Sequence, residues 1–562
     1  MRSQPKVLPP SGSTFREIIE GGFLYADKTK YIYWLVKRYK SCFLSRPRRF
    51  GKTLLLDTIR ELFQGDRELF KGLFIENKSD YAFEKHPVLR FSMGYAKLLA
   101  KKDLEDRIEY DLRFAAKNER VKLSAKTYGE MLGELLYGIS VKYRASAVIL
   151  IDEYDSPVAR HISNPELASD FRDVLHEFYS ALKQNFMYIR FSILTGTTRL
   201  AFTASDSGPN SFKDISLKPE FAGICGFTVP EFNKIFKNRF SKALKGLKKI
   251  GDIGQDAERE TLKAKILEWY GGYNWLGKDQ VLNPYSIINF FDDERLCAYW
   301  PSSGHPSRLS ALMRERPLDF IRPKLDSYFV DDVRSIDINS LEAVPVLFHS
   351  GYLTIDHRIR KNKQTIDGKT VDDETITFRF PNREVSLYFT SFCVEQIFCL
   401  QIGVIRDLVM KLPGALLRED SEVIADALHN LLAGPMSHMD ESPENRYRSM
   451  LHVALLAAGL EVIGETHGKS RSDSLVLLAD KVRVVIGLKY CKAVGTTDKE
   501  RLAEELASGL DEAEVQILDN DSIAPDRTAG CKVICLALAF RGKDEVAARF
   551  FDPEKIHEPR ES

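Results

Sequence analysis

Short apolar runs alternate with longer helical patterns through the N-terminal part of the chain. Buried strands are predicted at residues 41–45, 87–92, 147–152 and 188–195. Helices are predicted at residues 28–38, 54–63 and 165–184, and most of 96–143 also has helical periodicity. Because strands separated by helices usually pair in parallel, this pattern predicts an α/β fold with a parallel sheet.

The remaining sequence changes its pattern several times. Helical periodicity dominates residues 227–289, which we interpret as a helical lid over the sheet domain. At 346–380 a helix precedes two strands that flank a basic loop at 357–363, the outline of a winged-helix module. A basic tip suits phosphate contacts, although solvated hairpin tips are often basic too. Residues 386–432 are again helical in pattern.

Residues 46–53 join the first predicted strand to a helix and end like a phosphate-binding loop. In such a loop, backbone N–H groups hold phosphates, the lysine reaches the β- and γ-phosphates, and the hydroxyl holds Mg²⁺. Arg46 stands where the common G-x-x-x-x-G-K-[ST] pattern has a glycine, so the loop alone is a moderate signal. The expected nucleotide-binding residues here are Arg46, Pro47, Arg48, Arg49, Phe50, Gly51, Lys52 and Thr53.

A second motif stands at the end of the apolar strand at 147–152, where Asp152 is followed by Glu153. This is the form of a Walker B strand, in which Asp152 binds Mg²⁺ through water and Glu153 polarises the attacking water. Two carboxylates after one apolar strand are by themselves more often a solvated strand end. Both motifs in this order favour a nucleotide-binding P-loop core, and the adjacent glutamate favours an ATPase over a GTPase.

The strand at 188–195 ends in a polar segment that includes Thr195, Thr197 and Arg199. In ATPases with an additional strand between the two Walker strands, this strand end carries a sensor of the γ-phosphate. Thr195 or Thr197 is suited to that role, and Arg199 is suited to stabilise transition-state charge in its own or a neighbouring subunit. A helix-capping turn followed by a surface arginine explains the same residues equally well.

Composition narrows the class of protein without pointing to a partner. The chain of 562 residues has a net charge of +1, so global charge gives no reason to expect nucleic acid. Its 8 cysteines include no C-x-x-C pair, which favours core thiols over metal ligands. The N-terminus lacks an apolar signal segment and no run reaches the length of a membrane span. We therefore expect a cytoplasmic protein that does not contact a membrane.

The C-terminal part has the layout of a PD-(D/E)xK nuclease core. A helix is predicted at 444–456, and strands are predicted at 460–463, 475–478 and 482–489. In that core an aspartate and a glutamate two residues before the lysine share Mg²⁺, since residues i and i+2 of a strand face the same side. Asp473 and Lys489 fit the catalytic positions, and Glu444 and Asp473 are the expected metal ligands.

Gly487 stands two residues before the lysine, where the pattern requires a carboxylate. Losing one carboxylate weakens a hard-cation site, although Glu465, Glu512 or Gln516 could compensate. A degraded or binding-only nuclease fold is therefore favoured over an active one. The third interpretation is that Asp473 and Lys489 are surface charges on an unrelated fold. On the first reading, Gly487→Glu is expected to restore Mg²⁺-dependent nicking.

Several short blocks resemble those of the predicted AAA-ATPase-like proteins that carry a C-terminal PD-(D/E)xK nuclease-superfamily domain. The blocks are residues 25–29, 44–53, 151–157, 194–196, 225–228, 283–286, 350–354 and 381–385, and nuclease-like blocks continue to about 541. The resemblance accounts for Arg46, because the family's own loop has that form. It implies an ATPase core with the roles given above, ATP and Mg²⁺ as cofactors, and nuclease chemistry at the C-terminal site.

The expected fold class is therefore α/β multidomain, and each part has expected bounds. These are a P-loop AAA-like ATPase core (14–225), a helical lid (226–340), a winged-helix-like region (341–386), a helical connector (387–432) and a restriction-endonuclease-like domain (433–552). The leading hypothesis is ATP hydrolysis on DNA, with DNA favoured over RNA and a homo-oligomer possible. The alternatives are a nucleotide-gated conformational or assembly switch, and a nucleic-acid-binding protein with two decayed catalytic domains.

Overall fold

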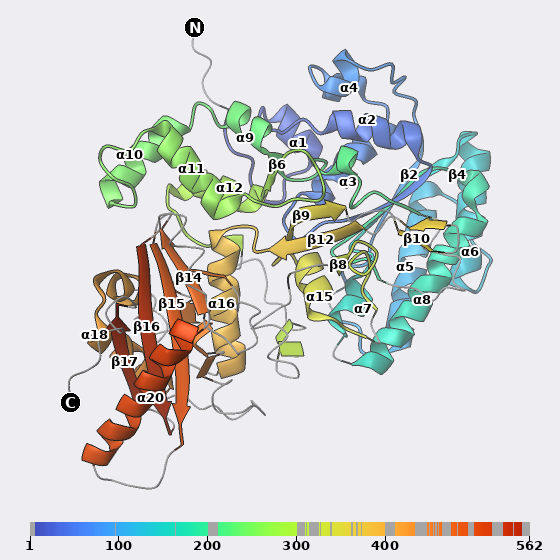
Figure 1. The fold of residues 1–562 in the computed structure, drawn as a ribbon. Helices are drawn as coiled ribbons and strands as arrows, with labels where there is room; N and C mark the ends of the chain where they lie inside the picture. Colours follow the sequence, from blue (N-terminus) through green and yellow to red (C-terminus); the bar gives the residue numbers. More distant parts are fainter. Residues whose placement is uncertain are drawn as a thin grey trace. The chain divides into compact units, whose positions relative to one another are not determined.

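The protein is represented by a computed structural model of residues 1–562, shown in Figure 1. The structure describes residues 6–552 except 96, 163, 201–211, 301–308, 311, 314–324, 326–327, 338–339, 361–363, 367–368, 372–373, 399–410, 433–446, 449, 453, 456–457, 459, 464–473, 480–481, 493–498, 520–531 and 543–544. The chain forms two compact units, which we call unit 1 (residues 1–309 and 324–385) and unit 2 (residues 310–323 and 386–562).

Unit 1 is built on a five-stranded parallel sheet whose strand order is β2-β3-β4-β1-β5. The strands are β1 (Ser41–Ser45), β2 (Val88–Ser92), β3 (Ala147–Asp152), β4 (Ile189–Gly196) and β5 (Lys213–Asp214). The first four lie within a residue or two of the predicted strands. β4 lies between β1 and β3, which confirms the expected additional strand between the two Walker strands. β5 was not predicted, because two residues carry no periodicity.

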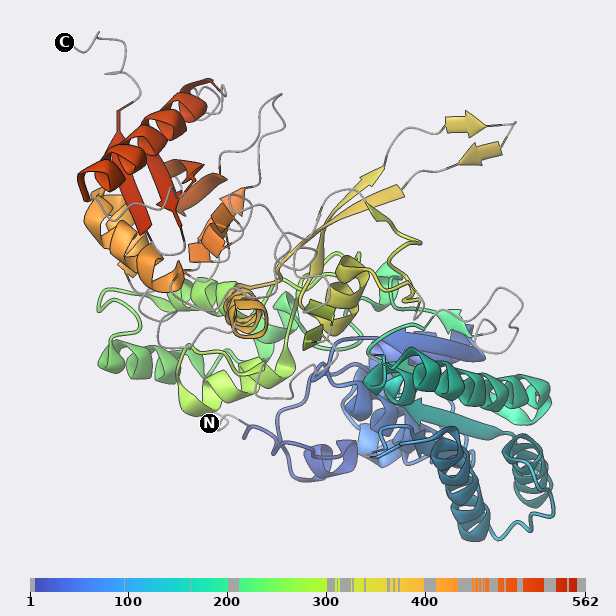
Figure 2. The ribbon, with the colours of Figure 1, turned by 90° about the horizontal axis from the view of Figure 1, so that it is seen from below.

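Helices cover the sheet because each presents an apolar face to it. The main ones are α2 (Thr29–Arg38), α3 (Lys52–Phe63), α5 (Lys101–Glu119), α6 (Tyr128–Tyr143) and α8 (Pro165–Gln184). Leu112 of α5, Leu132 of α6 and Phe178 of α8 share one buried cluster with Ile149 and Ile151 of β3. Figure 2 shows α5, α6 and α8 grouped along the same part of the sheet. The apolar strand β3 is therefore enclosed by protein along its length, and its acidic end lies at the edge of the sheet.

The lid region of unit 1 is helical, as predicted. It contains α9 (Val229–Ile235), α10 (Phe240–Ile250), α11 (Arg259–Tyr270) and α12 (Pro284–Asp293), which share a second buried core rich in phenylalanine. After it come α15 (Ala343–Ser350), β9 (Thr354–Arg360) and β12 (Glu374–Arg379), the last two paired in antiparallel. The helix and the pair of strands were predicted, but β9 continues to Arg360, so residues 357–360 of the predicted basic loop are strand, and residues 361–363 lie outside the described residues. In the part of the chain that the structure describes, no helix is both long and apolar enough to cross a bilayer.

Unit 2 contains a second five-stranded sheet in the order β13-β14-β15-β16-β17. Its elements are α16 (Arg383–Phe398), which begins in unit 1, α18 (Ser421–Leu432), β13 (Glu461–Ile463), β14 (Ser474–Ala479), β15 (Val482–Cys491), α20 (Lys499–Asp519), β16 (Lys532–Arg541) and β17 (Glu545–Phe551). β13, β14 and β15 are antiparallel neighbours, and β16 returns parallel to β15. The three predicted strands are therefore present, whereas the nuclease assignment itself stays a prediction.

The structure describes only some of the residues of the predicted nuclease site. Glu444, Glu465 and Asp473 lie outside the described residues. Lys489 is on β15, with its Nζ 4.0 Å from Glu512 Oε2 on α20. A Cβ atom at Gly487 would lie 2.7 Å from the Ala513 carbonyl oxygen and 2.8 Å from Ile517 Cγ1. Glycine at this position therefore permits the close packing of α20 on β15. This packing opposes a larger side chain at 487, and the expectation that Gly487→Glu restores a metal site stays a prediction.

We predict that Gly487→Ala destabilises unit 2 by roughly 1–3 kcal/mol, because the added methyl group must displace helix backbone. Hydrogen exchange of the β15 and β16 amides in the full-length protein measures the loss. Gly414→Ala is the matched control, since its Cβ would meet only the mobile end of the Arg418 side chain at 3.1 Å. Equal protection of β15 in Gly487→Ala and the wild type would contradict the packing role.

Candidate functional site

The segment between β1 and α3 forms the expected phosphate-binding loop. Gly51 caps α3 with φ of 90°, and Arg49 also has a left-handed φ of 68°. Lys52 is buried, and its Nζ donates to the carbonyl oxygens of Arg46 at 2.8 Å and Pro47 at 2.9 Å. Burial lowers the pKa of Lys52, and the nearby Asp152 carboxylate partly opposes that shift. The Lys52 ammonium group is thus hydrogen-bonded to two loop carbonyls. In a phosphate-binding loop, the same group contacts phosphate oxygens.

Arg46 fills the place of the missing glycine with a buried side chain. Its Nη1 donates to the carbonyl oxygens of Ser45 and Ser216, both at 2.8 Å. Its Nη2 makes longer contacts to the carbonyl oxygens of residues 221 and 222, and the guanidinium lies 4.2 Å from the ring centre of Trp275. Burial lowers the Arg46 pKa to about 10. The side chain therefore braces the loop against the chain that follows β5, and only its backbone belongs to the loop surface.

The other loop residues divide into buried and exposed ones. Phe50 is buried, with its ring edge-to-face against Tyr273 and Trp275 of the lid region. Arg48 and Arg49 are exposed, and the Arg49 guanidinium lies 5.0 Å from the ring centre of Tyr285. The direct nucleotide contacts predicted for these residues stay predictions.

The Walker B aspartate connects three elements at the sheet edge. Asp152 Oδ2 accepts a hydrogen bond from Thr53 Oγ1 of α3 at 2.7 Å. Asp152 Oδ1 accepts from Thr195 Oγ1 of β4 at 2.8 Å and from the backbone N–H of Glu153 at 3.0 Å. The structure therefore brings together four of the predicted site residues: Lys52, Thr53, Asp152 and Thr195.

These oxygen atoms fit a hard cation. A hydroxyl and a carboxylate oxygen 2.7 Å apart are donors that Mg²⁺ accepts, and Mg²⁺ usually completes its shell with water and substrate phosphates. Within the described residues, no group of three or more His, Cys, Asp or Glu side chains is placed to hold a metal ion alone.

Glu153 follows Asp152 in a left-handed conformation with φ of 51°, and its carboxylate lies exposed against Gly94. Such a conformation is uncommon outside glycine and is found disproportionately at functional sites.

A residue not predicted for the site lies two positions further on. Asp155 accepts hydrogen bonds from Thr197 Oγ1 at 2.7 Å and from the Thr198 backbone N–H at 2.8 Å. The sequence signals for Asp155 are its place three residues beyond the Walker acid and within the family-like block at 151–157.

The two sensor candidates therefore have different partners. The hydroxyl of Thr195 is bound to Asp152, and the hydroxyl of Thr197 is bound to Asp155. Arg199 Nη1 donates to Asp214 Oδ2 at 2.8 Å. In this conformation Arg199 is held within its own chain, and its role in the transition state stays a prediction.

Residues 77–80 spell Asn-Lys-x-Asp, the guanine-reading motif of GTPases. The structure places them at the end of α4 (Phe74–Asn77), between α3 and β2. Asp80 accepts hydrogen bonds there from Tyr33 OH at 2.5 Å and from Lys37 Nζ at 2.9 Å. Asp80 is therefore bound to α2 side chains, and the segment gives no support for a guanine site.

A buried carboxylate connects the loop to the lid region. Glu384 accepts hydrogen bonds from Ser286 Oγ at 2.8 Å and from the backbone N–H groups of Tyr299 and Trp300 at 2.6 and 2.7 Å. The Trp300 indole N–H in turn donates to the Arg48 carbonyl oxygen at 3.4 Å. Burial raises the Glu384 pKa to about 7. Blocks at 283–286 and 381–385 thus meet beside the phosphate-binding loop, a convergence that sequence reasoning missed.

An apolar cavity opens beside Gly51, on the flank of α3. Its walls come from the N-terminal segment, the loop and the lid region. Lining residues include Ile18, Tyr25, Phe50, Leu54, Ile224 and Ile288.

We predict that Arg46→Gly, which restores the common loop pattern, destabilises unit 1 by at least about 3 kcal/mol. It removes a buried cation that bonds several carbonyl groups and stacks on Trp275. Thermal unfolding measures the loss. Arg48→Gly is the matched control in the same loop because Arg48 is exposed, and an equal effect of both changes would contradict the bracing role.

We also predict a pH dependence of stability from Glu384. A carboxyl group with a raised folded pKa holds its proton more tightly when folded. Its contribution to stability is therefore complete below its ordinary pKa of 4.5 and is lost as pH rises through about 7. The Glu384→Gln variant should not show this loss of unfolding free energy, which is about 3 kcal/mol. It should therefore unfold at a higher temperature than the wild type at pH 8 but not at pH 5. Glu268→Gln, at an exposed ion pair with Arg383, should show no such crossover.

Comparison with known proteins agrees with this geometry. A family model described as "Predicted AAA-ATPase" matches residues 10–204, which contain the loop, both Walker strands and the strand between them. A protein of Azotobacter chroococcum mcd 1, described as "Uncharacterized protein in vnfD 5'region", is 32% identical over 383 residues. The similarity covers 68% of this chain and 68% of that protein. The chain therefore belongs to the predicted AAA-ATPase family.

Proposed function

We propose that unit 1 binds ATP with Mg²⁺ and hydrolyses it. The observation that carries the proposal is the 2.7 Å hydrogen bond between Thr53 and Asp152. It joins the end of the phosphate-binding loop to the end of the acidic strand, and Lys52 lies beside it. Few functions other than phosphate and cation binding require a threonine, a lysine and an aspartate at one edge of a parallel sheet.

Each residue has a defined task in this proposal. Lys52 exchanges its two loop carbonyls for phosphate oxygens, and the N–H groups at the start of α3 hold the same phosphates. Thr53 and Asp152 are the residues that would hold Mg²⁺, which when bound neutralises phosphate charge as a Lewis acid. Glu153 orients and polarises the attacking water from the exposed side of the site.

The apolar cavity beside Gly51 supports a purine base as the other end of the ligand. Ligand pockets are mostly apolar with a few polar groups that fix orientation, and here the aromatic side chains of Tyr25 and Phe50 contribute to the walls. The cavity adjoins the helix end that would hold the phosphates. Adenine is the proposed base because the Asn-Lys-x-Asp segment is engaged with α2.

DNA is the proposed partner of the ATPase, and unit 2 is proposed to bind without cleaving. One observation favours a polyanion. Among the described residues that line one pocket, Arg199, Lys213, Lys218 and Arg334 are cationic and Asp214 alone is acidic. For unit 2, the close packing at Gly487 leaves no room for a carboxylate side chain there, which argues against cleavage. Mg²⁺-dependent nicking of DNA by the wild type would overturn that part of the proposal.

We predict that Lys52→Ala abolishes ATP binding and that Glu153→Gln binds ATP but hydrolyses it about 10²-fold more slowly or worse. Lys52 neutralises part of the negative charge of the phosphates, whereas Glu153 acts only on the attacking water. Steady-state hydrolysis and equilibrium ATP binding, each with and without single- and double-stranded DNA, measure both effects. Arg113→Gln, at an exposed ion pair with Glu109 on α5, is the control for a charge change outside the site.

The outcomes separate the alternatives. Lysine-dependent hydrolysis that DNA stimulates supports the full proposal. Hydrolysis indifferent to DNA, with ATP-dependent oligomer formation, favours the nucleotide-gated switch instead. Wild-type protein that binds no ATP would overturn the proposed function and leave a binding protein with a decayed ATPase core. Equal hydrolysis by Glu153→Gln and the wild type would remove Glu153 as the base.

A further inference from the structure

Arg90 lies between two carboxylates beside the nucleotide site. It is in the middle of β2, where it pairs with Leu150 of β3, two residues before Asp152. Its Nη2 lies 4.0 Å from Asp152 Oδ2, and its Nη1 lies 3.6 Å from Asp57 Oδ1 on α3. Both distances exceed that of a good hydrogen bond. One guanidinium is therefore shared between the Walker B aspartate and a second acid, and it is bound tightly to neither.

The second acid can take a further donor from Arg90. Asp57 is buried, and its Oδ2 accepts a 2.6 Å hydrogen bond from the Phe15 backbone N–H. Its Oδ1 pairs with Arg60, whose Nη2 lies 2.8 Å away, and Arg90 Nη1 lies 3.6 Å away. An ionised carboxylate oxygen accepts more than one donor. A small movement of the Arg90 guanidinium would give Oδ1 a second short contact.

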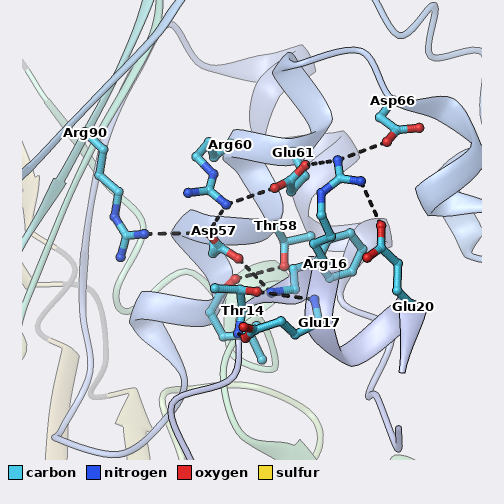
Figure 3. Close-up of polar contacts among 12 residues, drawn as sticks. Thr14, Arg16, Glu17, Glu20, Asp57, Thr58, Arg60, Glu61, Asp66 and Arg90 are labelled. Carbon is cyan, nitrogen blue, oxygen red and sulfur yellow. Dashed lines mark hydrogen bonds and ion pairs between the residues drawn. The ribbon is translucent and has the colours of Figure 1, made fainter. Parts of the chain in front are cut away.

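A network of ion pairs holds Asp57 in place. Figure 3 shows Arg60 between Asp57 and Glu61, and Arg16 of the N-terminal helix α1 (Phe15–Glu20) on the far side of Glu61. Arg16 contacts Glu61 at 2.7 Å and Asp66 at 3.0 Å. The acceptor offered by Asp57 is thus fixed from behind by residues that do not reach the nucleotide site.

The first acid is the one that would lose Arg90 when a cation arrives. Asp152 Oδ2 is the oxygen that also accepts from Thr53, so it belongs to the donor pair that fits Mg²⁺. A cation bound there and a guanidinium 4.0 Å from the same oxygen repel each other. Repulsion by the cation at Asp152 and attraction by the Asp57 carboxylate favour the same movement of Arg90.

We propose that Arg90 is a positioning residue with two positions: it is shared between Asp152 and Asp57 while no cation is bound, and it moves fully to Asp57 Oδ1 when a cation binds. The proposal rests on the proposed nucleotide function and adds a regulation of its metal step. Arg90 competes with the metal, and Asp57 relieves the competition. The Mg²⁺ affinity of the site is therefore set partly by a side chain that touches neither metal nor nucleotide.

Substitutions of Arg90 and of Asp57 should change the Mg²⁺ affinity in opposite directions. Arg90→Gln removes the competing charge, so the Mg²⁺ concentration at half-saturation should fall about tenfold. Asp57→Asn keeps an acceptor for the Phe15 N–H but turns an amide N–H toward Arg90, which drives the guanidinium onto Asp152. Its half-saturating Mg²⁺ concentration should rise several-fold. A role limited to stability would move both variants in the same direction or move neither.

The experiment is Mg²⁺ titration of the binding of a fluorescent, non-hydrolysable ATP analogue to the full-length protein. Arg90→Lys keeps the charge and should stay near the wild type. Arg113→Gln is the matched control, because it removes a charge from an exposed ion pair with Glu109 on α5. Thermal unfolding of each variant shows whether it is folded, and Asp57→Asn decides the matter alone if Arg90→Gln does not fold.

The outcomes distinguish the two proposals. Wild-type protein without Mg²⁺-dependent binding of the analogue would overturn the proposed function and the Arg90 mechanism with it. Wild-type binding that depends on Mg²⁺, with unshifted or equally shifted Arg90→Gln and Asp57→Asn, would overturn the Arg90 mechanism alone. Opposite shifts in the two variants support both.

Discussion

The site depends on the pairing of β4 with both β1 and β3. In parallel strands the carboxyl ends meet at one edge, and the register here sets Ser45 beside Gly196 and Ile151 beside Leu194. Asp152, Thr195 and the start of the phosphate-binding loop are therefore brought to the same edge by backbone hydrogen bonds alone. The short contacts of Asp152 with Thr53 and Thr195 follow from that register. Because β1 and β3 are buried along their whole length, a shift of register would expose apolar side chains.

Around this edge, charged groups are neutralised by the protein itself. Lys52 is bound to two carbonyls of its own loop, Arg199 to Asp214, and Arg90 is shared between two acids. Buried charges are costly unless they are paired or hydrogen-bonded, so an ATP site must satisfy its cations while no ligand is present. On the proposed function, binding is an exchange of partners, and the affinity for nucleotide and metal would depend on the partners that are given up.

The loop is also held from outside the sheet. Arg46 connects it to the chain that follows β5, Phe50 packs into aromatic side chains of the lid region, and Glu384 holds Trp300 near the Arg48 carbonyl. The contacts of the loop residues Arg46 with Ser216 and Arg48 with Trp300 join positions 170 and 252 residues apart in the chain. They explain why an arginine and a phenylalanine occupy a loop in which glycine is common: each side chain is directed into protein, while the backbone keeps the shape that phosphate requires.

Sequence by itself determined the order of strands and helices in the first domain, the two Walker motifs and the family. Those features depend on local periodicity and on residues at strand ends, and a parallel sheet brings such ends together. Only the tertiary structure decided that β5 pairs with β1, that Arg46 points away from the phosphates, and that Gly487 accommodates α20. The same holds for Asp155, Glu384 and the pair of acids around Arg90. Their partners are distant in the chain, and no local pattern encodes which buried acceptor a given side chain will reach.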